Sequence, residues 1–458
     1  MTRPLLIFCL LLSTLVAAQK TPATPAFQFP IKASENRRHF VDQAGKPFLF
    51  QADTGWLLFV NLTRSEAREY LMDRKKRGFT TLLTQFSAHP DKPNRAGQKP
   101  FLGNDFGQTN ENYFTHIEDV LRIADSLNLL VAVAPFWHSC CRDGYGSPGK
   151  YFDQNGPEKS RQLGEYLGRR FRNHNNLVWI MGGDNDPGSD RGPIDALATG
   201  LHQTAHRQMI TYHASATHSS TDVFDPATPW LSFSMVYTYW RGKPNIWLPP
   251  DQVPEVYEVC LNEFNRSDRM PFILGEAQYE GFEGNDKSTA DQPRRQAWWA
   301  MLSGAAGHAY GTPVYAFPTN WREYSSLPGL GSMSYLSTLF AALPWWRLVP
   351  DQWHRIIPEG YGTYGDKDWA PTALLDDGSL AISYLPTART VTIDLTQFSG
   401  SGVEARWLNP RTGEYITKGK LPRTRQKITP PGAGDWVLIL RADSFRDWLA
   451  ALPTPRDK

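Results

Sequence analysis

The sequence predicts an α/β protein, a (β/α)8 TIM barrel followed by a C-terminal antiparallel β-sandwich. Two observations support this fold class. Apolar runs of strand length alternate with amphipathic helical patterns up to about residue 350, and after that point short strand-like runs are separated by turn clusters. The length of 458 residues suits a barrel of about 250 residues with a smaller module attached.

Eight strands and seven helices are expected in the barrel. The strands lie near residues 48–53, 79–85, 129–136, 177–183, 208–213, 231–237, 272–276 and 306–311. The helices lie near 64–77, 112–127, 157–173, 192–206, 253–265, 291–303 and 333–343. Because helices separate the strands, the strands are expected to pair in parallel. A hairpin around residues 43–46 is expected before the barrel.

The C-terminal region has the pattern of a sandwich. Strand-like runs occur at 372–375, 380–384, 391–395, 403–408 and 435–440, with turn clusters such as 376–378 and 409–413 between them. We therefore expect a catalytic barrel over residues 36–348 and a β-sandwich domain over 349–458.

The first residues have the pattern of an export signal. Arg3 precedes an apolar stretch at 5–16, and small residues follow at 16–18. The apolar stretch is too short to cross a bilayer comfortably, so no membrane span is expected. We predict a signal peptide at 1–18, a flexible leader at 19–35, and a secreted or periplasmic protein.

Composition excludes several classes of partner. The net charge is only +2, from 48 basic and 46 acidic residues without a block of like charge, which argues against nucleic acid. The motifs GxxxxGK[ST] and GxSxG are absent from the sequence, so neither a nucleotide cofactor nor a serine nucleophile is expected. Aromatic residues reach 13%, which suits a large core and also the aromatic faces used by sugar sites. The sequence is silent on oligomeric state.

Two apolar runs, 179–185 and 272–278, each break at glycine and then deliver a carboxylate, Asp184 or Glu276. They fall at the ends of the fourth and seventh predicted strands, and barrel active sites are built at such ends. Paired carboxylates are the groups that cleave glycosidic bonds. We expect Asp184 to be the general acid/base and Glu276 to be the nucleophile or base.

The other strand ends offer hydrogen-bonding and stacking side chains. The candidate substrate-binding residues are Asp53, Trp56, Gln85, His138, Asn185, His213, Tyr237, Trp240, Gln278 and His308. Tyr237 is expected to donate a hydrogen bond to Glu276 and to hold it ionised. The set predicts an oligo- or polysaccharide as the partner.

These assignments have alternatives. Asp184 could be the N-cap of the following helix, and Asp186 could then be the acid. Glu276 could form an ion pair at the barrel rim, Asp53 could stabilise a turn, and each tryptophan could belong to the core. The histidines come from separate strands without HxH or HExxH spacing, so no metal site is expected.

Several of these segments resemble one known family. The run Ala52-Asp53-Thr54-Gly55-Trp56-Leu57-Leu58-Phe59 resembles the opening of the apiosidase-like glycoside hydrolases of family 140, and so do 179–185 and 274–276. Residues 406–413 resemble a collagen-binding-type β-domain found in such proteins. Where this family would have Gly before Asp53 and Ala before Trp56, the chain has Ala and Gly.

The resemblance covers roughly residues 36–442. It implies a secreted barrel enzyme that hydrolyses apiose-containing linkages in pectin, such as those of rhamnogalacturonan II, and it assigns catalysis to Asp184 and Glu276. Two alternatives stay open: a non-catalytic carbohydrate- or matrix-binding barrel, and a glycosidase of another specificity such as an arabinofuranosidase.

Overall fold

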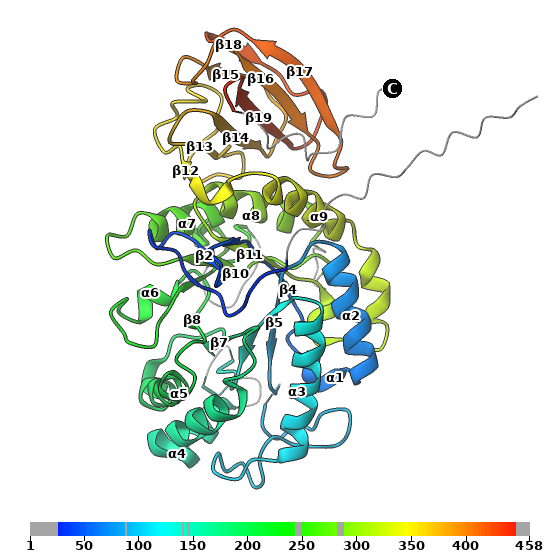
Figure 1. The fold of residues 1–458 in the computed structure, drawn as a ribbon, viewed down its shortest axis with the longest axis vertical. Helices are drawn as coiled ribbons and strands as arrows, with labels where there is room; N and C mark the ends of the chain where they lie inside the picture. Colours follow the sequence, from blue (N-terminus) through cyan, green and yellow to red (C-terminus); the bar gives the residue numbers. More distant parts are fainter. Residues whose placement is uncertain are drawn as a thin grey trace, which may run out of the picture.

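The computed structural model describes residues 26–87, 89–139, 142–143, 147–242, 249–281 and 288–445. The predicted signal peptide at 1–18 lies outside the described residues, as does the first part of the leader at 19–25. Figure 1 shows a helix-covered barrel and, at one side of it, a smaller body made of strands.

Eight parallel strands form the barrel sheet. They are β4 (Phe50–Thr54), β5 (Thr81–Gln85), β6 (Leu130–Ala134), β7 (Leu177–Gly182), β8 (Ile210–His213), β9 (Ser234–Tyr237), β10 (Phe272–Glu276) and β11 (Gly307–Tyr310). Their order is β8-β7-β6-β5-β4-β11-β10-β9, so the first strand pairs with the last. A parallel bridge between Ile210 and Leu231 joins the two ends of the sheet. The predicted barrel is confirmed.

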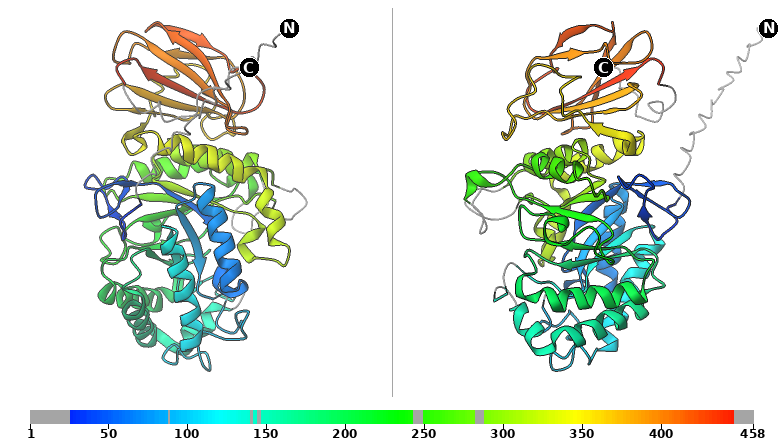
Figure 2. Two further views of the ribbon diagram at one scale, coloured as in Figure 1. Left: turned by 45° about the vertical axis from the view of Figure 1, so that its right-hand side comes forward. Right: turned by 90° about the vertical axis from the view of Figure 1, so that its left-hand side faces the viewer.

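Helices surround this sheet, as both views in Figure 2 show. They are α2 (Arg64–Lys76), α3 (Glu111–Ser126), α4 (Pro148–Phe171), α5 (Arg191–Thr204), α7 (Val256–Phe264), α8 (Asp291–Leu302) and α9 (Pro328–Ala341). Two short helices, α1 (Leu58–Asn61) and α6 (Ser220–Val223), were not expected from the sequence. Within the described parts of the chain, none of the helices has the length and apolarity needed to cross a membrane.

A small antiparallel sheet precedes the barrel. It consists of β1 (Lys32–Ala33), β2 (Phe40–Val41) and β3 (Pro47–Phe48), and β2 and β3 form the predicted hairpin. The end of the expected leader is not a free tail, because Phe27 packs edge-on against Phe48 with ring centroids 4.8 Å apart. The prediction of a flexible leader therefore needs correction for residues 26–35, which belong to the folded body.

The C-terminal region forms two antiparallel sheets. Its strands are β12 (Leu348–Pro350), β13 (Thr372–Leu375), β14 (Leu380–Leu385), β15 (Val391–Asp394), β16 (Val403–Leu408), β17 (Tyr415–Leu421), β18 (Arg425–Ile428) and β19 (Trp436–Ala442). Six of them pair in the order β12-β13-β14-β19-β16-β17, and β15 pairs with β18. Buried side chains such as Ile393, Trp407 and Leu438 form a core between the sheets. This confirms the predicted β-sandwich.

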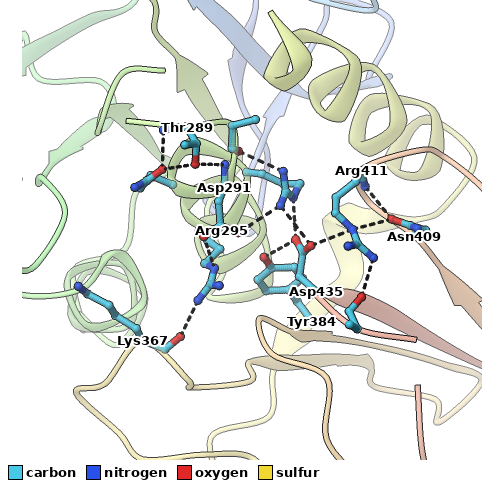
Figure 3. Close-up of polar contacts among 12 residues, drawn as sticks. Thr289, Asp291, Arg295, Lys367, Tyr384, Asn409, Arg411 and Asp435 are labelled. Atoms are coloured by element: carbon cyan, nitrogen blue, oxygen red, sulfur yellow. Dashed lines mark hydrogen bonds and ion pairs between the residues drawn. The ribbon is translucent and has the colours of Figure 1, made fainter. Parts of the chain in front are cut away.

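Helix α8 joins the two domains. Its Trp298 stacks on Tyr384 of β14, with centroids 5.9 Å apart and an interplanar angle of 11°. Arg294 Nε donates to Asp435 Oδ2 at 2.6 Å, and the Tyr384 hydroxyl donates to the same oxygen at 2.9 Å. Figure 3 shows this network, in which Arg411 also lies within 3.4 Å of Asp435. The sandwich is therefore fixed to the helix that follows the seventh barrel strand.

Candidate active site

A cavity of about 520 Å³ opens beside the carboxyl ends of the barrel strands, a size typical of small-molecule sites. Its lining consists of Trp56, Leu57, Asn61, Gln85, Lys92, Trp137, Ser139, Asp184, Tyr239, Glu276, Tyr279, Tyr315 and Ala316. Asp184 follows β7 and Glu276 ends β10, so the fourth and seventh strands of the barrel deliver both acids to one cavity.

The turn that carries Asp184 depends on two glycines. Gly182, Gly183 and Asp184 have φ values of 77°, 128° and 56°. A Cβ atom on Gly183 would lie 2.4 Å from the Trp137 ring, and one on Gly182 would lie 2.5 Å from the Tyr212 ring. Asp184 itself occupies the left-handed region, which costs energy for a residue other than glycine and is often found at functional sites.

The pKa of the Asp184 carboxyl group is raised into the neutral range. Burial, followed by the negative charge of Glu276, raises its pKa to about 7, while His213, Trp137 and Tyr237 oppose that shift. Its Oδ1 atom is buried and has no hydrogen-bond partner among the described residues. A carboxyl group that is protonated near neutral pH suits a general acid.

Glu276 is oriented by hydrogen-bond donors. Its Oε2 atom lies 2.9 Å from Nε2 of His213. The Tyr279 hydroxyl also hydrogen-bonds Glu276, and it accepts a bond from Trp56 Nε1 at 2.7 Å. Burial and the adjacent charge of Glu276 keep the pKa of Tyr279 well above its usual value, so the tyrosine stays a donor. Donors of this kind favour the charged carboxylate and fix its direction.

His213 connects the two acids. Its Nδ1 atom lies 3.2 Å from the backbone nitrogen of Asp184, which can donate to it, while Nε2 faces Glu276. Nδ1 is also 3.2 Å from the carbonyl oxygen of Ala214. Burial lowers the pKa of His213, but the hydrogen bond and charge of Glu276, together with Asp184, raise it above the usual value. Nδ1 can therefore accept a hydrogen bond from the backbone of Asp184 when it is unprotonated, and can donate one to the carbonyl of Ala214 when it is protonated.

The three side chains form a tight group. One oxygen of Asp184, one ring nitrogen of His213 and one oxygen of Glu276 lie within 4.8 Å of one another. That spacing could also serve a metal ion, since imidazole and carboxylate are metal ligands. In this structure, however, His213 Nε2 is already used by Glu276.

Some of the predicted binding residues lie where they were expected. Trp56 and Gln85 line the cavity beside the acids. Tyr237 is buried at the end of β9 and lies against Asp184. Its hydroxyl donates to that of Tyr239, so the expected bond from Tyr237 to Glu276 is corrected: the tyrosine that bonds Glu276 is Tyr279.

Asp53 does not reach the cavity. Its side chain is fully buried, accepts a bond from the Tyr70 hydroxyl at 2.6 Å, and forms an ion pair with the equally buried Arg74. Both partners lie on α2, so Asp53 fixes this helix to the first barrel strand. The expectation that Asp53 binds a sugar hydroxyl is thereby corrected.

Three other predicted binding residues, His138, Trp240 and Gln278, lie outside the cavity lining and contact other parts of the protein. His138 Nε2 lies 3.0 Å from Asp190 Oδ2. Trp240 stacks on Trp299 of α8 at 5.7 Å, and Gln278 Nε2 donates to Ser288 Oγ at 2.7 Å. These side chains support loops around the site and are not part of the cavity lining.

Asn185 and His308 also lie outside the cavity lining. The backbone carbonyl of Asn185 accepts a bond from the Tyr212 hydroxyl at 2.7 Å, which holds the turn after Asp184. His308 is buried within β11, where burial lowers its pKa to about 4 and keeps it neutral.

The alternative roles for the acids are not observed. The N-cap residue of α5 is Asp190 and not Asp184. Asp186 pairs with His218 at 2.8 Å and accepts the Ser215 hydroxyl, and it does not line the cavity. Glu276 pairs with the buried His213 and not with a lysine or arginine at the rim among the described residues.

The cavity also contains residues that were not selected from the sequence. The polar and aromatic ones are Asn61, Lys92, Trp137, Ser139, Tyr239, Tyr279 and Tyr315. Trp137 and Tyr239 are the chain neighbours of the candidates His138 and Trp240, so their signal was present. Tyr279 lies three residues beyond Glu276, and Tyr315 lies in a later loop, where strand-end positions give no guidance.

A barrel that brings two strand-end acids into one cavity is the arrangement of enzymes that hydrolyse glycosidic bonds. The sequence profile of the apiosidase-like catalytic domain matches residues 34–347, and the chain belongs to that family of glycoside hydrolases. A second profile, "Putative collagen-binding domain of a collagenase", matches residues 349–441.

Solved structures agree with this assignment. One described as a glycoside hydrolase is 25% identical, with a TM-score of 0.81 over 91% of this chain and 98% of its own. A family 5 glycoside hydrolase from Bacteroides vulgatus is 22% identical and shows the same fold, with a TM-score of 0.83 over 93% of this chain and 96% of its own. No curated protein sequence matches the chain.

Proposed function

We propose that the protein is a retaining apiosidase that removes apiose-containing side chains from pectin-type glycans such as rhamnogalacturonan II. The observation that carries the proposal is the apiosidase-like match over residues 34–347, whose two strand-end acids share one cavity. One carboxyl oxygen of Asp184 and one of Glu276 lie within 4.8 Å of each other. This close approach favours retention, since retaining enzymes hold their carboxyl groups about 5–5.5 Å apart and inverting enzymes about 6.5–9.5 Å apart.

The proposed reaction has two steps. Protonated Asp184 donates its proton to the leaving oxygen while Glu276 attacks the anomeric carbon, which breaks the glycosidic bond and forms a glycosyl ester. Ester formation removes the charge of Glu276, one of the causes of the raised pKa of Asp184. Ionised Asp184 then takes a proton from water, and the hydroxide formed cleaves the ester with retention of configuration.

The walls of the cavity suit a sugar. Trp56, Trp137 and Tyr315 offer aromatic surface for the apolar C–H faces of a sugar ring. Gln85 lines the same cavity, and its buried Oε1 atom has no partner among the described residues. A substrate hydroxyl would satisfy that acceptor, because an unpaired buried carbonyl is costly.

The test is release of apiose from rhamnogalacturonan II by the full chain, measured by chromatography beside arabinose-linked substrates. Asp184→Asn should lower turnover roughly 10²- to 10⁴-fold, and Glu276→Gln should lower it at least as much. Asp186→Asn is the matched control, since Asp186 lies two residues on but outside the cavity lining. Equal turnover in the wild type and both catalytic variants would refute the assignment.

Further outcomes separate the alternatives. Release of arabinose without apiose would identify an arabinofuranosidase, and binding without any turnover would indicate a non-catalytic protein. Loss of activity with a chelator would favour a metal bound by Asp184, His213 and Glu276. For the retaining mechanism, azide should restore turnover to Glu276→Ala and give a glycosyl azide, whereas an inverting enzyme gives no such product.

We propose that the chain is exported after removal of residues 1–18. The basic residue, the apolar stretch and the small residues before Gln19 support this. N-terminal sequencing of the protein purified from its native host should begin at Gln19; an intact Met1 would contradict export by this route.

A further inference from the structure

A second cavity, of about 580 Å³, lies where the barrel meets the sandwich. One side is formed by Asn262 of α7 and by Asn265, the residue that follows this helix. The other side is formed by the segment between β12 and β13, including Gln352, His354 and Tyr364. Figure 1 shows α7 directly beneath β12 and β13. We call this cavity the junction groove; it shares none of its lining residues with the catalytic cavity.

Aromatic rings form much of the junction groove. His354 and Tyr361 stack with centroids 3.7 Å apart and an interplanar angle of 5°. Trp369 supports the group edge-on, with its centroid 5.1 Å from that of Tyr364. Tyr364 is 51% exposed, and Trp353, between two groove residues in the chain, is 85% exposed. Large aromatic side chains held at a surface in this way are typical of binding sites.

The polar groups of the groove are uncharged. Asn265 and Gln352 donate to each other across the domain junction at 2.8 and 3.0 Å. Among the described residues, no Asp, Glu, Lys or Arg lines the groove, and burial lowers the pKa of His354, so that ring is neutral at pH 7. Asn262 and Thr363 are exposed. Aromatic faces beside neutral donors and acceptors match the apolar faces and hydroxyls of neutral sugars.

A proline-rich or collagen-like peptide is the competing occupant, since such peptides also bind aromatic grooves. Proline has no N–H group, so a chain rich in it has few donors for the exposed polar groups of Asn262 and Thr363. A sugar carries several hydroxyls that can both donate and accept. The amide-rich lining therefore favours a glycan.

We propose that the junction groove is a second, non-catalytic binding site that holds neutral sugars of the polysaccharide on which the enzyme acts. The inference depends on the proposed function only in requiring a polymeric glycan as the substrate.

The test uses the full chain with Asp184→Asn to prevent turnover, and isothermal titration calorimetry to measure affinity. The probes are rhamnogalacturonan II, neutral arabinan, acidic homogalacturonan and a (Pro-Pro-Gly)10 peptide. We expect a neutral-sugar glycan to bind, and Tyr364→Ala and Trp353→Ala each to weaken that binding roughly 2- to 12-fold. Met72→Ala on α2 is the matched control, because Met72 is 53% exposed and far from the groove in sequence.

A kinetic arm uses the active enzyme. Tyr364→Ala should raise KM for the polymer with kcat unchanged, and should leave hydrolysis of a short oligosaccharide unaltered. Unchanged glycan affinity in both aromatic variants would overturn the proposal. So would peptide binding that Tyr364→Ala abolishes, in the absence of glycan binding. Groove-dependent glycan binding without apiose release would support the groove while contradicting the proposed specificity, so the two failures are distinguishable.

Discussion

Asp184 combines burial, a neighbouring carboxylate and a left-handed backbone, and its raised pKa has a consequence for rate. The acid must be protonated to start the reaction, and its pKa is about 7. We expect kcat/KM to fall as the pH rises through about 7, measured as a pH profile on the glycan substrate. In Asp184→Asn that descending limb should be absent from the residual activity. A limb that stays in place would mean that another group is the acid.

The raised pKa of Asp184 should also make the free energy of unfolding depend on pH. The folded-state pKa of Asp184 is raised from 3.8 to about 7, so between these values the folded protein holds a proton that the unfolded chain has lost. The free energy of unfolding therefore decreases as the pH rises through this window. Asp184→Asn removes the effect, and its melting temperature relative to wild type should increase from pH 4 to pH 7. A constant difference across that range would contradict the raised pKa.

For Asp53 we predict a loss of stability with little loss of activity. Removing one partner of a buried ion pair leaves the other charge unpaired, which costs about 3–5 kcal/mol. Asp53→Asn should lower the free energy of unfolding on this scale, measured by denaturant titration, with little loss of turnover per folded molecule. Glu69→Ala, which breaks the exposed pair with Arg322, should change little. If a stable Asp53 variant lost turnover, Asp53 would have a role in the active site.

Strand ends identified the two acids, Trp56 and Gln85, because strand geometry alone places such positions at the barrel mouth. Asp53 also stands near a strand end, but its partner Arg74 lies 21 positions on, and sequence does not show that α2 packs against this carboxylate. Tyr279 was missed for the same reason. Its role depends on its hydrogen bonds with Glu276, three residues before it, and with Trp56, which is 223 residues away in the chain.

At the scale of elements, prediction succeeded where burial imposes a pattern. The eight barrel strands are buried along their length, and the residues of β6 and β7 form apolar runs. Strand β17 was missed because only its first residue, Tyr415, is buried and because it carries Lys418 and Lys420. Helices α1 and α6 have four residues each, too few to show a helical period.

One element, α8, holds two loops of the active site. Gln296 is fully buried; its Oε1 accepts from the backbone of Gln278 at 2.9 Å, and its Nε2 donates to the carbonyl of Tyr239 at 3.2 Å. Gln296→Leu should lower kcat/KM roughly 10- to 100-fold by misplacing these loops, and should cost about 1–3 kcal/mol of stability. Steady-state kinetics and melting measurements test this.

Gln292→Leu is the control for Gln296. Gln292 lies on the same helix, but among the described residues its side chain accepts its hydrogen bonds from Thr289, just before the helix start. It should lose some stability with little change in kcat/KM. Equal kinetic losses in both variants would show that α8 as a whole, and not the Gln296 contacts, is responsible.

At the scale of the whole molecule, the sandwich and the barrel are joined through buried contacts. Side chains of α8 face the barrel through Trp299, which contacts Trp240, and face the sandwich through Trp298 and Arg294. Neither domain's own pattern in the sequence reveals this, because Arg294 and Asp435 lie 141 residues apart. The sandwich therefore supplies buried contacts to α8, the helix that supports the active-site loops.

The two domains should therefore unfold together. Arg294 and Asp435 are both nearly fully buried, and Asp435→Ala leaves Arg294 without its main partner, at a cost of about 3–5 kcal/mol. We expect one calorimetric transition in the wild type and one at lower temperature in the variant. Asp376→Ala, which breaks an exposed contact with Arg347, is the matched control and should leave the transition nearly unchanged. Two separate transitions in the wild type, with the barrel transition unaffected by Asp435→Ala, would show that the barrel is stable without the sandwich.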